Sequence, residues 1–270
     1  MKNLKELNAS DSSGIDQIGI KRLDLIQLHA SHNPNIKNVS WMKNLKELYA
    51  NARCGIDQNG ISGLDLIKLE VCNNSKIKDV SFMTSLKELY SPGSCGINQM
   101  GIKGLDLIKL FVNNNSKIKD VSWMINLKEL HAGGNSRINQ SGIKGLDLIK
   151  LDVWDNKKIK DVSFMKNLKI LDARGDCGID QSGINELNLI KLDVGCNSKI
   201  KNVNFMTNLK KLYASWSSGI DQNGIKNLDL IKLVINNNDK INDVSFMTNL
   251  KELYASGNCG IYQSAIEGLD

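Results

Sequence analysis

Hydrophobic side chains recur along the chain at a short and regular spacing. The segment that begins at Leu45 follows the pattern Leu-x-x-Leu-x-Ala-x-x-x-x-x-Ile, which starts again at Leu66 and at Leu86 with valine or serine at the sixth position. Successive side chains of a strand point to opposite faces, so the fourth and sixth positions share a buried face and the fifth points outward. The pattern predicts a short strand around the fourth position of every unit.

Thirteen such units follow one another, in two alternating types of 21 and 20 residues. Leucine fills the first and fourth positions and isoleucine the twelfth in all of them. One unit cannot bury its leucines alone, whereas stacked units bury them against one another, which predicts a parallel sheet of about 13 short strands. We expect a single domain over 1–270, whose double repeats span 1–41, 42–82, 83–123, 124–164, 165–205 and 206–246, with a partial copy at 247–270.

This pattern resembles the leucine-rich repeat, and the resemblance covers the whole chain. It implies an α/β solenoid that is rich in β structure. The expected shape is a curved, right-handed superhelix whose parallel sheet lines the concave side. The outward side of the strands would then be the face available for binding.

Three positions recur in the segments that return from one strand to the next. An asparagine at the ninth position of the second unit type resembles the asparagine ladder of this family, whose amides bond to buried turn backbone. A glutamine of the first type, Gln17 and its equivalents, suggests a second hydrogen-bonding ladder. A glycine two residues later is expected in a turn with positive φ. The asparagines are Asn33, Asn74, Asn115, Asn156, Asn197 and Asn238, and the glycines are Gly19, Gly60, Gly101, Gly142, Gly183 and Gly224.

Composition and charge narrow the classes of function. Hydrophobic residues make up 41% of the chain, but no run of 18 apolar residues predicts a transmembrane helix. A net charge of +6 is too small an excess to predict a nucleic-acid partner. One row of cysteines recurs two strands apart, about 10 Å, too far for disulfides. Free thiols predict a reducing, intracellular and cytoplasmic location. The row is Cys54, Cys95, Cys177 and Cys259.

No arrangement of residues in the sequence predicts catalysis, a metal site or a cofactor. A phosphate-binding glycine loop is absent, and no nucleophile pairs with a base outside the repeat pattern. His29 and His32 have the spacing of two metal ligands but lack a third. We therefore expect that the protein is not an enzyme.

The fifth, seventh and eighth positions of the units vary most, and they lie on or just after the outward face of each predicted strand. Large aromatic residues gather there, although they are unfavourable in water and are enriched at binding hot spots. We predict a binding surface on the concave face, centred on 111–216. Its candidate residues are Tyr49, Tyr90, Phe111, His131, Asp152, Trp154, Asp155, Asp172, Arg174, Asp193, Tyr213 and Trp216.

Asp152, Asp172 and Asp193 fall on three successive predicted strands, about 4.8 Å apart, where like charges are destabilising. Two interpretations are open. Lysines at the third position of the same and neighbouring units neutralise the carboxylates, or the aspartates form an acidic patch flanked by two tryptophans and an arginine. Such a patch would attract a basic or amphipathic peptide.

The leading hypothesis is a non-enzymatic scaffold that binds a protein or peptide on its concave face, with no cofactor and no membrane association. One alternative is the substrate-recognition arm of a larger multidomain protein, such as a ubiquitin-ligase adaptor. Another is an engineered or purely structural repeat array without a ligand. Because neither end carries a capping sequence, we expect a segment of a longer array, or a chain that pairs end to end with another copy.

Overall fold

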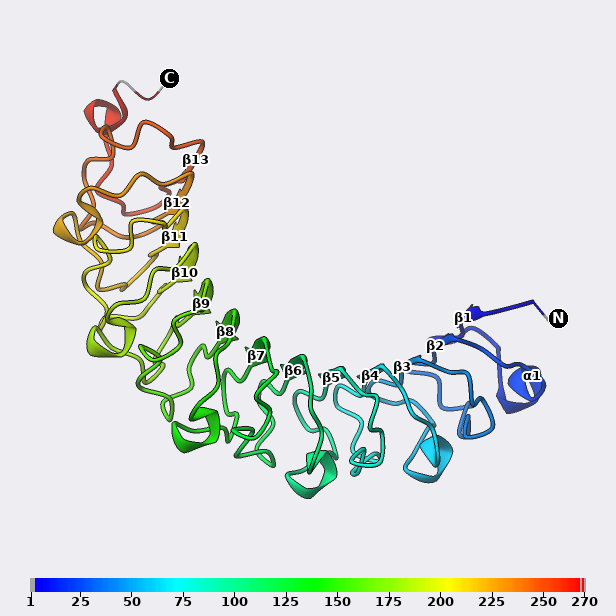
Figure 1. The fold of residues 1–270 in the computed structure, drawn as a ribbon. Helices are drawn as coiled ribbons and strands as arrows, with labels where there is room; N and C mark the ends of the chain where they lie inside the picture. Colours follow the sequence, from blue (N-terminus) through cyan, green and yellow to red (C-terminus); the bar gives the residue numbers. More distant parts are fainter. Residues whose placement is uncertain (1–2, 268, 270) are drawn as a thin grey trace. The chain divides into compact units, whose positions relative to one another are not determined.

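The computed structural model describes residues 3–267 and 269, and contacts between Cα atoms divide the chain into two compact units, 1–146 and 147–270. Each unit is a stack of repeats, with one three-residue strand per repeat (Figure 1). The first unit holds β1 (Glu6–Asn8), β2 (Gln27–His29), β3 (Glu47–Tyr49), β4 (Lys68–Glu70), β5 (Glu88–Tyr90), β6 (Lys109–Phe111) and β7 (Glu129–His131). The second holds β8 (Lys150–Asp152), β9 (Ile170–Asp172), β10 (Lys191–Asp193), β11 (Lys211–Tyr213), β12 (Lys232–Val234) and β13 (Glu252–Tyr254).

Within each unit the neighbouring strands pair in parallel, and the register sets the buried leucine of one strand beside that of the next, as Leu48 beside Leu69. The predicted solenoid with a parallel sheet is therefore confirmed. The expectation of a single domain over 1–270 stays a prediction. Residues 1, 2, 268 and 270, on which the expectation about the chain ends partly rests, lie outside the described residues.

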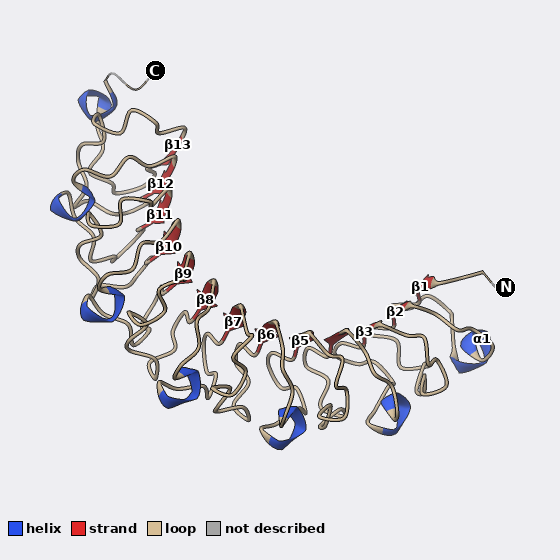
Figure 2. Cartoon of the chain, in the orientation of Figure 1, coloured by secondary structure: helices blue, strands red, loops and turns tan. Residues whose placement is uncertain are grey.

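Short helical turns line the side of each unit opposite the strands (Figure 2). Each belongs to a repeat of the first type, so they recur every 41 residues. None of the helices among the described residues has the length and apolar character that crossing a membrane requires. The turns are α1 (Gln17–Ile20), η1 (Asn59–Ile61), η2 (Met100–Ile102) and η3 (Ser141–Ile143) in the first unit, and η4 (Ser182–Ile184), η5 (Asn223–Ile225) and η6 (Gln263–Ile266) in the second.

The asparagine ladder is present as predicted. The amide of Asn115 is buried; its Nδ2 donates to the carbonyls of Ser91 and Ile97, and its Oδ1 accepts the backbone N–H of Lys117 at 2.8 Å. Asn33, Asn74, Asn197 and Asn238 make the same set of bonds. Each asparagine thus satisfies the turn backbone of the preceding repeat as well as its own.

The repeated glutamine forms a second ladder, farther along the same return segment. Oε1 of Gln58 accepts the backbone N–H groups of Lys78 and Asp79, each at 2.9 Å, and its Nε2 donates to the carbonyl of Asp79. One side chain therefore completes three backbone bonds of the following repeat. Gln17, Gln99, Gln181 and Gln222 repeat this arrangement.

The prediction of positive φ for the glycines after this glutamine is wrong. None of the six is among the residues with positive φ. At Gly60 and Gly101 the reason for glycine is close approach, because an added Cβ would lie 2.2 and 2.1 Å from the carbonyl oxygens of Lys37 and Lys78. The preceding repeat packs against the Cα itself, a requirement that the sequence pattern alone does not distinguish from a turn.

The cysteine row lies inside the solenoid. All six cysteines of the chain are free, and Cys54, Cys95 and Cys177 are buried. Burial raises the pKa of each of these three thiols to about 11, so they stay protonated and unreactive at neutral pH.

Replacing Asn115 by alanine should strongly destabilise the first unit. The substitution leaves two carbonyls and one N–H buried without partners, for which we expect a loss of about 2–4 kcal/mol of unfolding free energy in urea titrations. Asn126→Ala is the matched control: the exposed amide of Asn126 bonds to the carboxylate of Asp106, and its loss should change stability by less than about 0.5 kcal/mol. Equal effects of the two substitutions would contradict a structural role for the ladder.

Candidate binding site

Four of the predicted site residues lie in the first unit, where outward-facing rings stack on one another. The ring centroids of Tyr90 and Phe111 are 4.1 Å apart, and those of Phe111 and His131 are 4.0 Å apart. Tyr49 stacks in the same way on His29. These rings are only half-buried, but their faces are largely occupied by neighbouring rings.

A lysine connects the two groups of rings. The ammonium of Lys68, on β4, lies 4.8 Å from the ring centroid of Tyr49 and 5.0 Å from that of Tyr90. It also forms an ion pair with Glu70 at 3.1 Å. The outward faces of β2 to β7 thus form a continuous row in which stacked rings and the ammonium of Lys68 contact one another.

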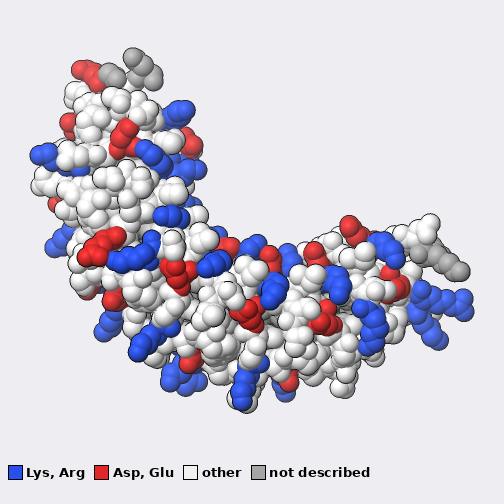
Figure 3. All heavy atoms as spheres, viewed as in Figure 1, with Lys and Arg blue, Asp and Glu red and all other residues white. Residues whose placement is uncertain are grey.

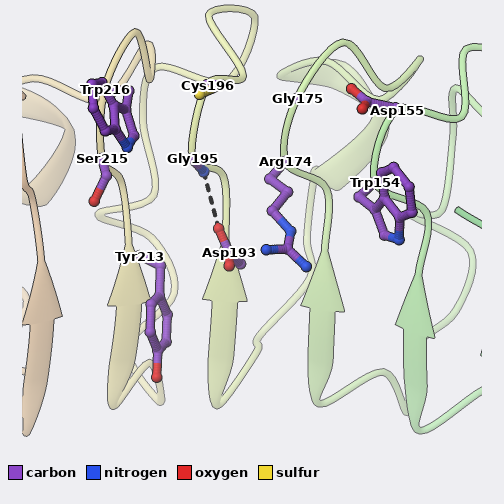
Figure 4. A pocket seen from close by; sticks show the side chains of 10 residues that line it. All are labelled: Trp154, Asp155, Arg174, Gly175, Asp193, Gly195, Cys196, Tyr213, Ser215 and Trp216. Carbon is purple, nitrogen blue, oxygen red and sulfur yellow. Dashed lines mark hydrogen bonds between the residues drawn. The ribbon is translucent and has the colours of Figure 1, made fainter. Parts of the chain in front are cut away.

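The outward face of the second unit is different, because a hollow of about 540 Å³ opens over β8 to β11 (Figure 4). Trp154 and Trp216 flank it, and the guanidinium of Arg174 extends between the strands toward Asp193. The hollow is lined by Trp154, Asp155, Arg174, Gly175, Asp193, Gly195, Cys196, Tyr213, Ser215 and Trp216.

Small residues create this hollow. Between the two tryptophans the seventh and eighth positions hold Gly175, Gly195 and Cys196, whose side chains are absent or short. Trp154 is half-buried, whereas Trp216 is 59% exposed. Two large apolar walls therefore face an open centre with polar groups on its floor, an arrangement typical of ligand sites.

The backbone at the eighth position of every described repeat is left-handed, with φ between 53° and 71°. In most double repeats the eighth position of the second unit type holds asparagine or aspartate, and the eighth position of the unit that follows holds glycine. Oδ1 of Asp155, for example, accepts the N–H of Asp176 at 2.8 Å and lies 2.1 Å from where a Cβ on Gly175 would be. The acceptor of one repeat thus forces glycine in the next.

Cys196 and Trp216 replace this pair at the hollow. Cysteine lacks the carboxamide oxygen that would collide with a Cβ at the next eighth position, so residue 216 can carry a side chain. Trp216 has φ of 60°, a conformation unfavourable for a bulky residue. Both changes, cysteine at 196 and tryptophan at 216, are needed to place this indole at the rim of the hollow.

The three aspartates have a structural task in addition to their charge. Asp193 Oδ1 accepts the N–H of Gly195 at 3.0 Å, and Asp172 Oδ1 accepts that of Arg174 at 3.3 Å. In other repeats a seventh-position asparagine accepts a backbone N–H of the next repeat, as Asn51 does for Cys72 at 2.7 Å. Each aspartate here bonds instead to its own strand end, which leaves the seventh position open to other residues.

The charges of the aspartates are only partly neutralised. Arg174 makes two contacts with Asp172, at 2.9 and 3.1 Å. Burial, followed by the charges of Asp193 and Asp152, raises the pKa of Asp172 from its ordinary 3.8 to about 6. Burial also raises the pKa of Asp193, which forms no ion pair among the described residues.

A third-position lysine contributes to the neutralisation, since the charges of Arg174 and Lys191 both lower the pKa of Asp193. Lys191 lies over the ring of Tyr213, 4.9 Å from its centroid, and the described ion pair of Asp172 is with Arg174 instead. Over the visible face of each unit, basic and acidic side chains are interspersed (Figure 3). The lining of the hollow therefore holds two carboxylates, those of Asp155 and Asp193, and one guanidinium, that of Arg174, within a surface of mixed charge.

The structure brings together six of the twelve predicted site residues: Trp154, Asp155, Arg174, Asp193, Tyr213 and Trp216. Asp152 and Asp172 pair in register with Asp193 along β8 to β10. Tyr49, Tyr90, Phe111 and His131 are in the ring stack of the first unit. Sequence reasoning missed Gly175, Gly195, Cys196 and Ser215. The available signal was that positions 196 and 216 lack the asparagine or aspartate and the glycine that most equivalent pairs of positions hold.

No group of three or more histidine, cysteine, aspartate or glutamate residues in the described part of the chain is arranged to hold a metal ion. The arrangement at the hollow can do non-covalent chemistry: stacking on indole rings, hydrogen bonding to a carboxylate and pairing with a cation.

Asp172→Asn should stabilise the protein in a pH-dependent way. Below about pH 3 the carboxyl is protonated in both the folded and the unfolded state. Between the unfolded pKa of 3.8 and the folded pKa of about 6 the unfolded state loses its proton first, so the wild type loses stability as the pH rises, and the penalty is complete above about pH 6. The variant should come closest to wild type near about pH 3 and exceed it by about 1–3 kcal/mol at about pH 7.5 in urea titrations. A difference that does not depend on pH would contradict the shifted pKa.

Trp216→Gly should leave stability unchanged or raise it by up to about 1 kcal/mol, because it restores the residue that suits positive φ. Cys196→Asn should destabilise the wild type, where the new oxygen meets the Cβ of Trp216, and stabilise Trp216→Gly. A double-mutant cycle by thermal unfolding measures this coupling. Additive effects of the two substitutions would show that the residues are independent.

Comparison with known proteins supports the fold. No protein-family model and no curated protein matches the sequence. Among solved structures, the chain is similar to an internalin, InlF of Listeria monocytogenes, with a TM-score of 0.54, 19% identity, and coverage of 99% of this chain and 86% of that one. For the functional domain of InlJ from the same species, which includes a cysteine ladder, the TM-score is 0.56 and the identity 20%.

The match to InlJ covers 93% of this chain but only 57% of that one. A chain of the yeast Rad7–Elc1 complex has a TM-score of 0.51 at 17% identity, with coverage of 92% and 80%. Identities this low bear on the fold alone. The thirteen repeat units and the parallel solenoid agree with it: the chain is a leucine-rich-repeat solenoid.

Proposed function

We propose that the protein is a binding scaffold that holds a protein or peptide in the hollow over β8 to β11. The observation that carries this proposal is the pair Cys196 and Trp216. Asparagine or aspartate followed by glycine occupies four of the six equivalent pairs; His32 and Ala52 lack it too, but tryptophan stands at the left-handed position at 216 alone. A folding requirement alone would favour the asparagine–glycine pair there, because it adds a hydrogen bond and avoids an unfavourable φ. An exposed tryptophan held against the preference of the scaffold indicates a use outside the scaffold.

The charge of the hollow favours a basic side chain as the group bound. Asp193 has a carboxylate without an ion-pair partner among the described residues, and Asp155 lies exposed at the rim. Neighbouring carboxylates already raise the pKa of Asp172, so a cation placed among them would relieve their repulsion. The faces of Trp154 and Trp216 add cation–π attraction for lysine or arginine.

The fold suits a protein partner. Structural similarity includes a chain of the Rad7–Elc1 complex, whose description names an assembly of two proteins. The outward face of a parallel sheet presents side chains from successive strands at regular spacing, so an extended peptide could contact several repeats at once. Binding by shape, ring stacking and charge needs no covalent step.

Selection from a displayed library of random peptides tests the proposal. Immobilised wild type should enrich peptides with arginine or lysine beside apolar residues. The double variant Trp154→Asn/Trp216→Gly, which restores residues found at equivalent positions in other repeats, should not enrich them. Selected peptides should bind each single variant about tenfold or more weakly in fluorescence anisotropy.

Trp41→Phe is the control, because the row of return-side aromatics contains phenylalanine as well as tryptophan and lies away from the outward face. It should bind the selected peptides as wild type does. Peptides that bind the double variant equally well would place their site elsewhere. Enrichment of acidic peptides that depend on the two tryptophans would contradict the assignment of a basic ligand.

A further inference from the structure

A second hollow lies in the first unit, on the side opposite the strands, between η2 and η3. Its volume is about 710 Å³. Met100, which is 67% exposed, and Trp123, which is 38% exposed, contribute apolar surface. Basic side chains surround them, and Asp120 is the acidic residue of the lining. The basic residues are Lys103, Lys117, Lys119 and Arg137.

The chain supplies its own comparison for this hollow. Three double repeats later, the equivalent groove beside η5 has about 430 Å³ and is lined by Gln222, Asn223, Lys226, Asn227, Asp243 and Phe246. Asn223 there corresponds to Met100, and Phe246 to Trp123. The equivalents of Lys119 and Arg137 are Asn242 and Gly260, which are not basic. The groove in the first unit is therefore larger and more apolar than its equivalent beside η5. Lysine is the common residue at the position of Lys119, so Arg137, where every other repeat of the first type has glycine, is the basic residue that departs from the pattern.

Arg137 is the most informative of these differences. Equivalent positions hold glycine, and an added Cβ on Gly96 or Gly178 would lie 2.3 Å from a carbonyl oxygen of the preceding repeat. The backbone bond from Arg137 to Asn115, at 3.1 Å, is nevertheless kept and lies between those of the equivalent Gly178, at 2.9 Å, and Gly260, at 3.3 Å. The side chain of Arg137 is exposed and forms no ion pair among the described residues.

Both walls of the hollow have also lost a negative charge. The residue that caps each helical turn is aspartate at 16, 57, 180 and 221 but asparagine at 98 and 139. Asn98 Oδ1 accepts the N–H of Met100 at 2.9 Å and Asn139 Oδ1 that of Gly142 at 3.0 Å, as Asp57 does for Gly60. The cap is kept while the carboxylate is removed, on the two turns that border this hollow.

We propose that this second hollow binds an acidic peptide segment that carries an apolar side chain next to a carboxylate. The apolar side chain lies against Met100 and Trp123, and the carboxylate pairs with Arg137, whose guanidinium suits bidentate contact. Lys103 and Lys119 add positive potential. Lys117 contributes less, because its ammonium already donates to the carbonyl of Cys95 at 2.8 Å.

The charge pattern favours an acidic peptide over a nucleic acid or a lipid surface. Both of those partners need positive charge along an extended track. Lysines do recur on this side of the repeats, but aspartates at 79, 120 and 161 interrupt them, and the capping aspartates return beyond the hollow. The excess of positive charge is confined to a single groove, which fits a short acidic segment.

A fluorescein-labelled peptide of alternating glutamate and leucine or phenylalanine is the probe, with anisotropy at low salt as the measurement. Wild type should bind it, and Arg137→Gly, which restores the common residue, should bind about tenfold or more weakly. Met100→Asn, the residue of the equivalent groove, should also weaken binding. Lys226→Ala, in that equivalent groove, should leave binding unchanged, as should Trp154→Asn/Trp216→Gly in the hollow of the second unit.

Three further probes complete the experiment: the same peptide with lysine for glutamate, a single-stranded RNA oligonucleotide and phosphatidylserine vesicles. The proposal expects weaker binding to each than to the acidic peptide. It is overturned when wild type fails to bind the acidic probe, when Arg137→Gly binds it as well as wild type, or when RNA or vesicles bind more tightly.

Discussion

The fold depends on one constraint: each repeat must satisfy the buried backbone of its neighbour. Leucine rows supply the hydrophobic free energy, but a turn of some 20 residues leaves carbonyls and N–H groups inside the stack that water cannot reach. Asn115 donates to the buried carbonyl of Ser91, and Gln99 accepts the N–H of Asp120 on the return segment of the next repeat. Because every repeat requires the same bonds, the same residues recur, and this explains why the chain repeats so closely.

That constraint makes departures from the pattern informative. A residue that breaks the rule at a bonded or close-packed position forgoes a favourable interaction, so drift there is less tolerated than at an open surface position. Arg137 occupies a position where every other repeat of its type holds glycine, and Trp216 one where most do, for a steric reason. Each lies at a hollow, and each is accompanied by a second change nearby that removes a clash or a charge. A residue that departs from the pattern at such a constrained position is therefore a stronger indication of a binding site than a residue at a variable surface position.

The sequence was sufficient for the strands, the leucine core and both amide ladders, because each depends on a residue type at a fixed spacing. It was insufficient where the physical reason lies between repeats. Gly60 suits a turn with positive φ as well as a close contact, and only the position of Lys37 O distinguishes the two. Phe111 has the residue type of a hot spot, but its ring faces meet Tyr90 and His131. The hollow depends on Gly195 and Cys196, and a search of the sequence for aromatic or charged side chains does not select residues as small as these.

The two hollows use the scaffold in different ways. On the strand side, aspartates at the fifth position take over the backbone bonds that asparagines make elsewhere, which frees the seventh position for Trp154 and Arg174. On the turn side, asparagines keep the caps of aspartates and remove only their charge. In both cases a hydrogen bond is preserved while the side chain that makes it is exchanged. A repeat scaffold can acquire a local charge of either sign in this way, because the geometry of the acceptor oxygen, rather than its charge, is what the stack requires.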